Sequence, residues 1–572
     1  MAHKTGRFAL IEQFLADGVS CMFGNPGTVE EGFLDALGSY PDLQYILTLH
    51  ETVALAMADG YARATRKPAV VQVHSGVGLG NSIGMLYQAW RGHTPLIVIN
   101  GEAGIRYDAM DGQMAADLVT MARPVTKWAT RVVDPSSLLR VLRRATKIAA
   151  TPPMGPVFVC LPMDILDALV EEEVVPTTFP VTRVAPEADQ IALAASLLAT
   201  GQKPMIIVGD GIAASNAQTE LTHVAEQLGA EVWGADSSEV NMRMDHPLYK
   251  DLLGHMFGEH SRAITSQADA VLICGTYVFP EVFPALANVF APGASVVHID
   301  LNAYEVGKNF PITLGLISDP QATLAKLADA LSTIMTPQQK SAASTRANQH
   351  AVYKEQETIA RKRADKTRRN SAPLHASQFM EELAAMLPSD AIIFDEALTS
   401  SADVLHYLPP ILPGHYFMTR GGSLGVGIPG ALGIKLAHPD KTVLGICGDG
   451  GSMYTIQALW TAAHQKIGAK FVICHNSSYE LLKLNLKHYW DERHISEHQF
   501  PDCFDIRTPD IQFVELARAM GVQAIRVERA EQIIPALREA LTDDEPFLID
   551  LVLSSEIPNH IMQKVARRYS QA

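Results

Sequence analysis

The chain lacks several features that mark whole classes of protein. It has no apolar run near the ~18–20 residues that a membrane-spanning helix needs, so we expect no membrane contact. Its start, MAHKTGRFALIEQF, holds one short apolar stretch broken by charge, and we expect no secretory signal. A formal net charge of -16 argues against a nucleic-acid partner, because nucleic acids favour basic surfaces.

Cysteine is scarce as well, with six in 572 residues and no CxxC pair. Such wide scatter fits neither a disulfide framework nor a zinc site. We interpret the cysteines as buried thiols in a reducing cytosol, and we expect a cytoplasmic protein. They are Cys21, Cys160, Cys274, Cys447, Cys474 and Cys503.

Short β-branched runs alternate with longer helical patterns along most of the chain. Continuous apolar strands separated by helices predict parallel sheets that are buried on both faces. The fold class is therefore α/β, with several doubly wound parallel sheets. The expected strands include residues 69–73, 95–100, 156–161, 204–208, 270–274, 295–299, 391–394, 443–447, 470–474 and 546–551.

Two stretches break this rhythm. Residues 169–186 contain several prolines and no helical period, which is typical of a linker. Residues 336–373 are polar and end in the basic run ARKRADKTRRNSAP. That run could bind anions or nucleic acid, or it could be a solvated connecting helix or loop, and the acidic chain as a whole favours the second interpretation. With ~150 residues per domain, the breaks predict three domains, at residues 1–180, 186–335 and 374–572.

A glycine-rich turn follows one of the expected strands. Residues 441–452 read KTVLGICGDGGS, and an amphipathic helix is expected over residues 455–466. Glycines let the backbone approach a ligand closely, and a helix N-terminus offers free N–H groups to phosphate. The turn therefore predicts phosphate binding by Gly448, Gly450, Gly451 and Ser452.

Oxygen-bearing side chains stand at the ends of this strand and the next. Asp449 follows the first strand, and Asn476 follows the strand KFVIC. Ligands bind at the carboxyl ends of parallel strands, and magnesium prefers about six hard oxygens. Asp449, Asn476 and the carbonyl of Ser478 could supply three of them, with diphosphate and water completing the set. Taken singly, such residues could also be a strand-end turn and a helix cap.

The spacing of Asp449 and Asn476 resembles that of enzymes that use thiamine diphosphate. A second segment, YILTLHETVALAMADGYARAT, is similar to the E-x-x-A-x-x-x-A-x-G-Y-A pattern of the decarboxylases and acetohydroxyacid synthases in that family. The resemblance implies that Glu51 hydrogen-bonds N1′ of the aminopyrimidine and so promotes removal of the C2 proton. Without the resemblance, Glu51 could simply be an acid in the first turn of a helix.

The same resemblance assigns two further loops to the cofactor. In RGGSLGVGIP, residues 420–429, Leu424 matches the apolar wedge over which the cofactor bends, and the carbonyl of Gly422 would bind the 4′-amino group. Residues 395–399, DEALT, resemble the other diphosphate loop, with Thr399 as hydroxyl donor and Glu396 as a weaker candidate for a contact. The three domains then become a pyrimidine-binding, a middle and a diphosphate-binding domain.

Three positions are similar to substrate-facing residues of the family. Thr28 ends FGNPGT, where benzoylformate decarboxylase has a serine, and His74 follows a strand at the place of that enzyme's first catalytic histidine. His74 could shuttle a proton, or it could be a strand-end histidine bonded to backbone. Gln113, in DGQMAAD, resembles a polar contact of acetohydroxyacid synthases and pyruvate oxidases.

The sequence departs from the family pattern at positions that would contact the substrate. The second active-site histidine of benzoylformate decarboxylase is missing, and Val282 falls near its position. The stretch SSYELLKLN places Glu480, Leu481, Leu482 and Asn485 along the expected pocket, and two leucines suit a small aliphatic donor such as pyruvate. In the middle domain, PMIIVGDGIAAS lacks G-x-G-x-x-G, so we do not expect FAD there.

The sequence therefore predicts a lyase that uses thiamine diphosphate and Mg²⁺. We expect a 2-keto acid decarboxylase and carboligase, closest to benzoylformate decarboxylase, that forms acyloins from a 2-keto acid and an aldehyde. Two alternatives stay open: an acetolactate synthase-like or pyruvate oxidase-like enzyme acting on pyruvate, and a catalytically silent cofactor-binding scaffold. Because Glu51 and Asp449 lie in different domains and family members bind cofactor between subunits, the resemblance implies a homodimer or homotetramer.

Overall fold

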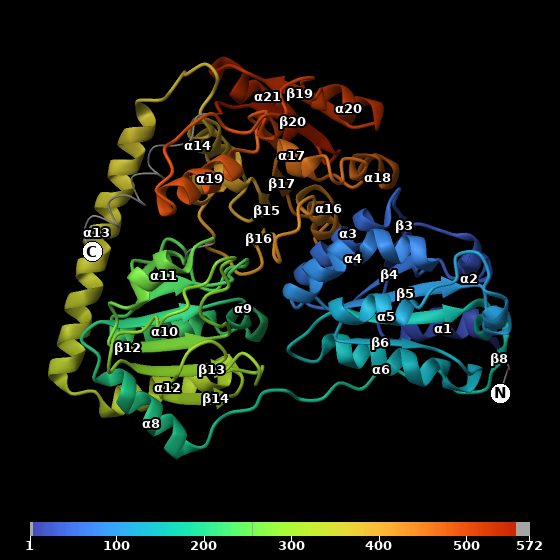
Figure 1. Ribbon diagram of the computed structural model, residues 1–572, viewed down its shortest axis with the longest axis horizontal. Helices are drawn as coiled ribbons and strands as arrows, with labels where there is room; N and C mark the ends of the chain where they lie inside the picture. Colours follow the sequence, from blue (N-terminus) through green and yellow to red (C-terminus); the bar gives the residue numbers. More distant parts are fainter. Residues whose placement is uncertain (1–3, 254–255, 556–572) are drawn as a thin grey trace.

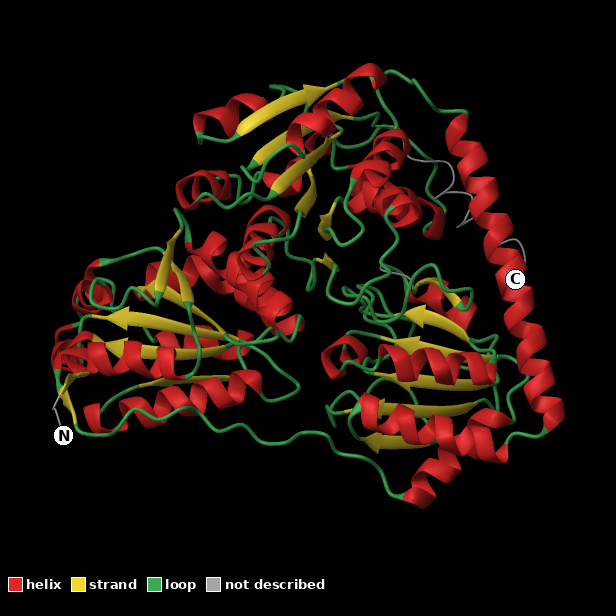
Figure 2. Cartoon of the chain, turned by 180° about the vertical axis from the view of Figure 1, so that it is seen from behind, coloured by secondary structure: helices red, strands yellow, loops and turns green. Residues whose placement is uncertain are grey.

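The computed structural model describes residues 4–253 and 256–555 and confirms the α/β class. This part of the chain forms three six-stranded sheets in which every neighbouring pair of strands is parallel. Helices cover both faces of each sheet (Figures 1 and 2). The inner strands of the sheets are almost wholly buried, which explains why they appear in the sequence as unbroken apolar runs, whereas the edge strands are partly exposed.

The first domain has the strand order β3-β2-β4-β5-β7-β6. Its strands are β2 (Cys21–Gly24), β3 (Gln44–Leu47), β4 (Ala69–His74), β5 (Leu96–Glu102), β6 (Trp128–Arg131) and β7 (Val157–Pro162). Its helices are α1 (Gly6–Ala16), α2 (Glu31–Leu37), α3 (Glu51–Thr65), α4 (Ser75–Arg91), α5 (Leu118–Ala122), α6 (Leu138–Ala150) and α7 (Met163–Asp167). Two short strands, β1 (Lys4–Thr5) and β8 (Leu169–Val170), pair antiparallel beside it.

The middle domain has the order β11-β10-β9-β12-β13-β14. Its strands are β9 (Pro204–Val208), β10 (Glu231–Gly234), β11 (Tyr249–Leu252), β12 (Ala270–Cys274), β13 (Ser295–Asp300) and β14 (Leu314–Ile317). Its helices are α8 (Ala188–Ala199), α9 (Gly211–Ser215), α10 (Gln218–Leu228), α11 (Gly258–Thr265) and α12 (Pro320–Ile334).

The third domain has the order β16-β15-β17-β18-β20-β19. Its strands are β15 (Ile392–Glu396), β16 (Tyr416–Met418), β17 (Val443–Gly448), β18 (Lys470–His475), β19 (Gln523–Val527) and β20 (Phe547–Val552). Its helices are α14 (Ala376–Met386), α15 (Ser401–Tyr407), α16 (Gly427–Ala437), α17 (Asp449–Ser452), α18 (Ala458–Gln465), α19 (Glu480–Glu492), α20 (Phe513–Ala519) and α21 (Ile533–Ala540).

Two connections join the domains, where the sequence predicts its two breaks. Residues 171–187 run without helix or strand between the first and middle domains. The polar second stretch is mostly one long helix, α13 (Pro337–Lys366), which runs along the outside from the middle to the third domain (Figure 1). The boundaries at residues 180, 186, 335 and 374 stay predictions, and residues 556–572 of the expected third domain lie outside the described part.

The first and third domains meet along α3 and α16, which cross closely. A Cβ added at Gly60 would lie 2.2 Å from the Gly430 carbonyl oxygen, and one at Gly433 would lie 1.9 Å from that of Met57. Only glycine permits this backbone approach. The contact fixes the helix that starts at Glu51 against the helix that follows the loop of Leu424.

Two expectations about local structure are wrong. The helix expected over residues 455–466 is shorter, Ala458–Gln465, and the separate α17 begins directly at Asp449. The pair Gly450-Gly451 weakens helix formation, which accounts for a single short turn there. Of the cysteines, Cys503 is exposed, although the other five are buried as expected. No helix among residues 4–253 and 256–555 combines the length and apolarity needed to cross a bilayer.

Candidate active site

Glu51 is a buried carboxylate held by two side-chain amides. It starts α3, with His50 as N-cap, and is 6% exposed. Asn25 Nδ2 donates to Glu51 Oε1 at 3.3 Å, and Asn81 Nδ2 donates to Oε2 at 3.0 Å. A carboxylate that served only the helix dipole would lie in solvent, so this arrangement fits a group that orients a ligand. Neither asparagine is predicted from the sequence.

His74 is paired with a buried glutamate. At the end of β4, its Nδ1 lies 2.9 Å from Glu30 Oε2, while Glu30 Oε1 accepts the N–H of Gly101 at 3.0 Å. Burial raises the pKa of Glu30 above its ordinary value, although the hydrogen bond and charge of His74 oppose the shift. The partner of His74 is therefore a carboxylate and not backbone, and Glu30 was also missed from sequence.

The loop after β2 brings these groups together. It carries Asn25, which contacts Glu51, and Glu30, which contacts His74. Thr28 lies between them, exposed, at the start of a short 3-10 helix. A Cβ at Gly27 would lie 2.1 Å from the His74 ring, so glycine is required where the loop packs on the imidazole.

Gln113 lies in an exposed turn before α5. This turn runs against the N-terminus of α4, immediately after His74. A Cβ at Gly76 would lie 3.3 Å from Ala116 Cβ, and Ser75 Oγ lies 3.9 Å from Met114 Sδ. We call Glu51, Asn25, Thr28, Glu30 and His74 the first-domain cluster, and the Gln113 turn borders it.

Asp449 and Asn476 meet at the carboxyl ends of the adjacent strands β17 and β18. Asp449 Oδ1 accepts the N–H of Gly450 at 2.7 Å, and Oδ2 accepts those of Asn476 and Ser477 at 3.0 and 2.6 Å. The N–H of Ser478 donates to Asn476 Oδ1 at 3.1 Å. Burial raises the pKa of Asp449, and these backbone donors lower it again. Asp449, Asn476 and Ser478 form the third-domain cluster.

The turn around Asp449 leaves room for a ligand. A Cβ at Gly448 would meet only the Glu396 carbonyl oxygen, at 3.9 Å, whereas one at Gly450 would lie 2.5 Å from the Tyr479 ring. Oxygen ligands and close backbone N–H groups fit a diphosphate bound through magnesium. Because α17 has four residues, the turn amides and the metal would hold the phosphates, rather than the dipole of a long helix.

His475 anchors the loop that carries Asn476 and Ser478. It is buried directly before Asn476, with Nδ1 2.8 Å from Asp550 Oδ1 and Nε2 3.2 Å from Asp510 Oδ1. Burial alone would lower the pKa of His475, but the hydrogen bond and charge of Asp550, with Asp449 and Asp510, raise it above the ordinary value. The contacts to the two aspartates fix the imidazole and with it the end of β18.

Glu396 is a buried carboxylate that holds the loop of Leu424. Its two carboxylate oxygens accept the N–H groups of Gly425 and Gly427, both at 2.5 Å. A direct contact of Glu396 with the cofactor stays a prediction. Thr399 lies half-buried in the short 3-10 turn after β15, and Leu424 is half-buried in its loop.

The expected substrate-facing stretch is the start of α19. Leu481 and Asn485 are half-buried, and Leu482 is exposed. Glu480 is buried, with Lys483 Nζ 3.6 Å from its Oε2. Val282, at the position of the missing histidine, is 58% exposed.

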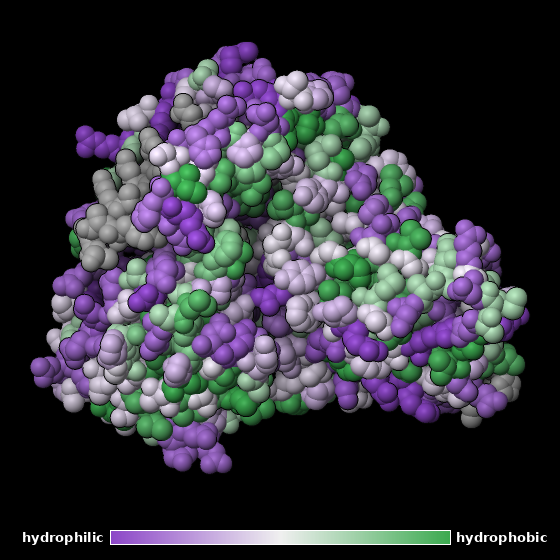
Figure 3. Space-filling model, viewed as in Figure 1, coloured by the Kyte–Doolittle hydropathy of each residue, from purple (hydrophilic) through white to green (hydrophobic). Residues whose placement is uncertain are grey.

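A separate cavity of about 540 Å³ lies where the three domains meet, and Figure 3 shows a hollow there. The cavity lies at the carboxyl ends of the strands in the sheet of the middle domain. Charged groups line it, among them Arg63, Asp210, Asp300 and Arg420. Arg420, which is buried, donates from Nη1 to the Gly92 carbonyl at 2.6 Å and pairs with Asp210. The absence of FAD from this domain stays a prediction.

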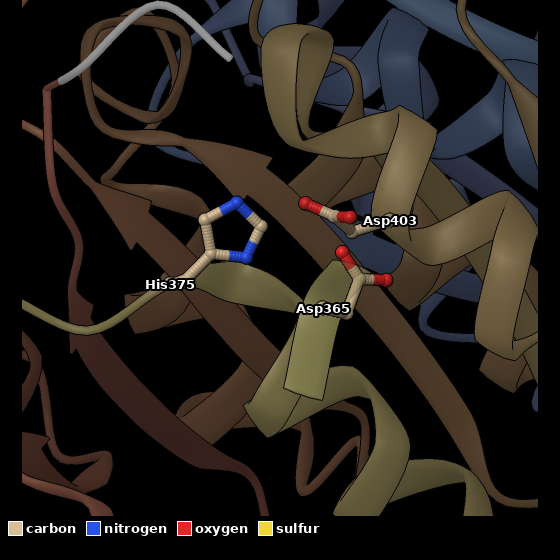
Figure 4. A group of neighbouring side chains, drawn as sticks. All are labelled: Asp365, His375 and Asp403. Atoms are coloured by element: carbon tan, nitrogen blue, oxygen red, sulfur yellow. The ribbon is translucent and has the colours of Figure 1, made fainter. Parts of the chain in front are cut away.

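Asp365, His375 and Asp403 form another group whose ligand atoms lie within 4.8 Å of one another (Figure 4). Arginines already supply the positive charge there: Arg361 Nη2 lies 3.2 Å from Asp403 Oδ1, and Arg368 Nη1 lies 3.0 Å from His375 Nε2. The group joins the end of α13 to α15 as an ion-pair cluster, away from the predicted metal ligands.

Within the described residues, no hydrogen bond or ion pair links the first-domain cluster to the third-domain cluster. Exposed apolar side chains stand beside each of them. Leu49 and Val77 flank the first-domain cluster, and Met453 and Tyr454 follow the turn of the third-domain cluster. Such apolar residues next to polar sites are typical of surfaces that another chain covers.

Comparison with known proteins gives three matches in order along the chain. They are the thiamine pyrophosphate enzyme N-terminal TPP binding domain at residues 4–121, the central domain at residues 191–327 and the C-terminal TPP binding domain at residues 399–551.

Full-length relatives agree with these matches. The chain is 28% identical to benzoylformate decarboxylase of Pseudomonas aeruginosa, over 96% of this chain and 98% of the relative. It is also 28% identical to the acetolactate synthase large subunit of Lactococcus lactis, over 96% and 92%. The solved thiamine diphosphate-dependent 4-hydroxybenzoylformate decarboxylase of Rhodococcus jostii RHA1 superposes with a TM-score of 0.83 at 26% identity, covering 97% of this chain and 100% of that one. The three matched domains, in this order and over this length, place the chain in the thiamine pyrophosphate enzyme family.

Proposed function

We propose that this protein is a thiamine-diphosphate-dependent 2-keto acid decarboxylase that also joins the decarboxylated fragment to an aldehyde, giving an acyloin. The pairing of His74 with Glu30, in the same cluster as Glu51, carries the proposal. A decarboxylase must return a proton to the carbon that loses CO₂, and a histidine oriented by a carboxylate is suited to that task. An anchored Glu51 also argues against the silent scaffold.

Each residue of the two clusters would have its own role. Asp449, Asn476 and the Ser478 carbonyl would hold Mg²⁺ and through it the diphosphate. When bound, thiamine diphosphate supplies the carbon that attacks the keto group and accepts the electrons left by CO₂. Glu51 would hold a proton at the aminopyrimidine, with Asn25 and Asn81 fixing its direction. His74 would give or take the substrate proton, and Thr28 would meet the carboxylate.

We propose that the complete site forms between two copies of the chain, in a homodimer or a homotetramer. Two observations support this: the clusters are unlinked within the described chain, and the exposed apolar residues Leu49, Val77, Met453 and Tyr454 border them. A two-fold axis would bring the first-domain cluster of each chain against the third-domain cluster of its partner. We place this enzyme in the cytoplasm, in line with its unpaired cysteines.

An enzyme that acts on pyruvate, with acetolactate or an oxidised acetyl group as product, is the second candidate. Leu481 and Leu482 at the start of α19 favour it, because they narrow the expected pocket, and Val282 supplies no second histidine. The likeness to acetolactate synthase also supports it.

Incubation with pyruvate and with benzoylformate, each with and without benzaldehyde, distinguishes the candidates. In the presence of thiamine diphosphate and Mg²⁺, the leading proposal predicts CO₂ release from benzoylformate and an acyloin when the aldehyde is added. Acetolactate from pyruvate alone would favour the second candidate. If neither keto acid, nor a wider panel of aliphatic and aryl keto acids, released CO₂, the decarboxylase proposal would be wrong.

A further inference from the structure

The loop of residues 420–427 carries Gly422 and Leu424 and has an unusual backbone. Gly421, Gly422 and Gly425 have φ values of 64, 77 and 83°, in the left-handed region that favours glycine. Glycine-rich segments lose much conformational entropy when they are fixed, so a loop of this kind needs restraint from its surroundings. A Cβ at Gly422 would meet nothing within 4 Å, which leaves its ligand side open.

Glu396 supplies that restraint at the C-terminal end of the loop. It is the last residue of β15 and is 2% exposed. One oxygen accepts the N–H of Gly425 and the other that of Gly427, so a single carboxylate fixes both sides of the turn that follows Leu424. Hydrogen bonds between backbone N–H groups and a buried carboxylate are among the stronger ones in proteins.

The same carboxylate lies beside the diphosphate turn. A Cβ at Gly451 would be 3.2 Å from Glu396 Oε1, and one at Gly427 would be 2.9 Å from Oε2. In the sheet, Glu396 is paired with Cys447, two residues before Asp449. Glu396 thus stands between two of the segments that would hold the cofactor. Burial raises the pKa of its carboxyl to about 7, and the backbone N–H groups of the loop act against that shift.

We propose that Glu396 is a positioning residue that holds residues 421–427 in the shape needed to receive the cofactor, without touching it. This inference rests on the proposed function in one respect, namely that Gly422 and Leu424 face the cofactor. It predicts that the free protein has a preformed loop, and that loss of the carboxylate weakens binding by leaving the loop to be ordered at the moment of binding.

The test compares Glu396→Gln with Asp319→Asn in the full-length protein. Glutamine keeps the size but offers an NH₂ group to one of the two backbone donors. Asp319 is the matched control, because it is also a buried carboxylate that accepts a backbone N–H group, that of Ala322 at 2.9 Å, and the hydroxyl of Ser215 at 2.7 Å, but it belongs to the middle domain and to none of the segments assigned to the cofactor. Two quantities are measured: thiamine diphosphate affinity at saturating Mg²⁺ by calorimetry, and amide hydrogen exchange of residues 421–427 without cofactor.

For Glu396→Gln we expect affinity to fall about ten- to a hundredfold, the range for losing a hydrogen bond to a charged group. We also expect faster exchange in residues 421–427, with unchanged exchange there in Asp319→Asn. If Glu396→Gln does not fold, Gly425→Ala perturbs the same turn from the other side, since its Cβ would lie 2.6 Å from Tyr454 Cβ, and it should have the same two effects.

The outcomes separate this inference from the proposed function. If the unchanged protein does not bind thiamine diphosphate, the proposed cofactor site is wrong, and the exchange data still test whether Glu396 orders the loop. If the unchanged protein binds and Glu396→Gln binds equally well with unchanged loop exchange, the positioning role is wrong. Equal losses in Glu396→Gln and Asp319→Asn would also overturn it, because they would indicate general destabilisation.

Discussion

Replacing Glu51 with glutamine is expected to lower turnover by at least about a hundredfold, the lower range for losing a general acid–base group. Affinity for thiamine diphosphate should change far less, because the magnesium and diphosphate contacts lie in the third domain. Glutamine keeps the volume, but its NH₂ group would face the amide of Asn25 or Asn81, so its orientation also changes. Steady-state turnover on the keto acid that releases CO₂, together with calorimetric titration of the cofactor, checks both parts.

Glu31→Gln is the matched control for this prediction. Glu31 is also the first residue of a helix, α2, but it is exposed. If an acid in the first turn acted only on the helix dipole, the two substitutions would have similar small effects. Near-normal turnover in Glu51→Gln would therefore contradict the assignment of Glu51 to the cofactor.

Replacing Asp449 with asparagine is expected to reduce the Mg²⁺-dependent affinity for thiamine diphosphate by more than about a hundredfold, since loss of a second-shell partner alone costs ten- to a hundredfold. The substitution removes a negative charge from the metal and sets an NH₂ group against backbone N–H groups of Gly450 or of Asn476 and Ser477. Calorimetric titration with and without EDTA measures the loss.

Asp319→Asn again serves as the control, because Asp319 is a buried carboxylate of the middle domain with protein donors of its own. It should retain cofactor binding. Circular dichroism at the same temperature would show that both variants are folded. If Asp449→Asn binds thiamine diphosphate as tightly as the unchanged protein, and EDTA still abolishes this binding, the metal is bound elsewhere.

The positions of Asp449 and Asn476 could be predicted from sequence because each directly follows an unbroken apolar strand, whereas Glu51 was found through its resemblance to the family pattern. A buried parallel strand has a clear apolar pattern, and its carboxyl end is where the first polar residue stands. The side-chain partners of the site residues were harder to predict. Glu30 lies far from His74 in sequence, and the two meet because β2 and β4 are neighbours in the sheet and Gly27 packs on the imidazole.

Glu396 shows how a small error in a strand boundary hides the direction in which a side chain points. The sequence predicts that the strand ends at residue 394, but β15 continues to Glu396. Side chains alternate between the faces of a strand, so Asp395 and Glu396 point to opposite sides. With the correct end, Glu396 would have been expected on the face that carries the loop of residues 420–427.

The central claim is that Glu51 of one chain and Asp449 of another complete one site. Co-expression of the Glu51→Gln and Asp449→Asn chains with different tags, followed by purification of the mixed dimer, tests it directly. In the mixed dimer one of two sites would contain both intact residues, so the account predicts about half the wild-type rate of CO₂ release, although each parent variant is inactive. A mixed dimer as inactive as its parents would contradict the claim, because a site built within one chain cannot be restored this way.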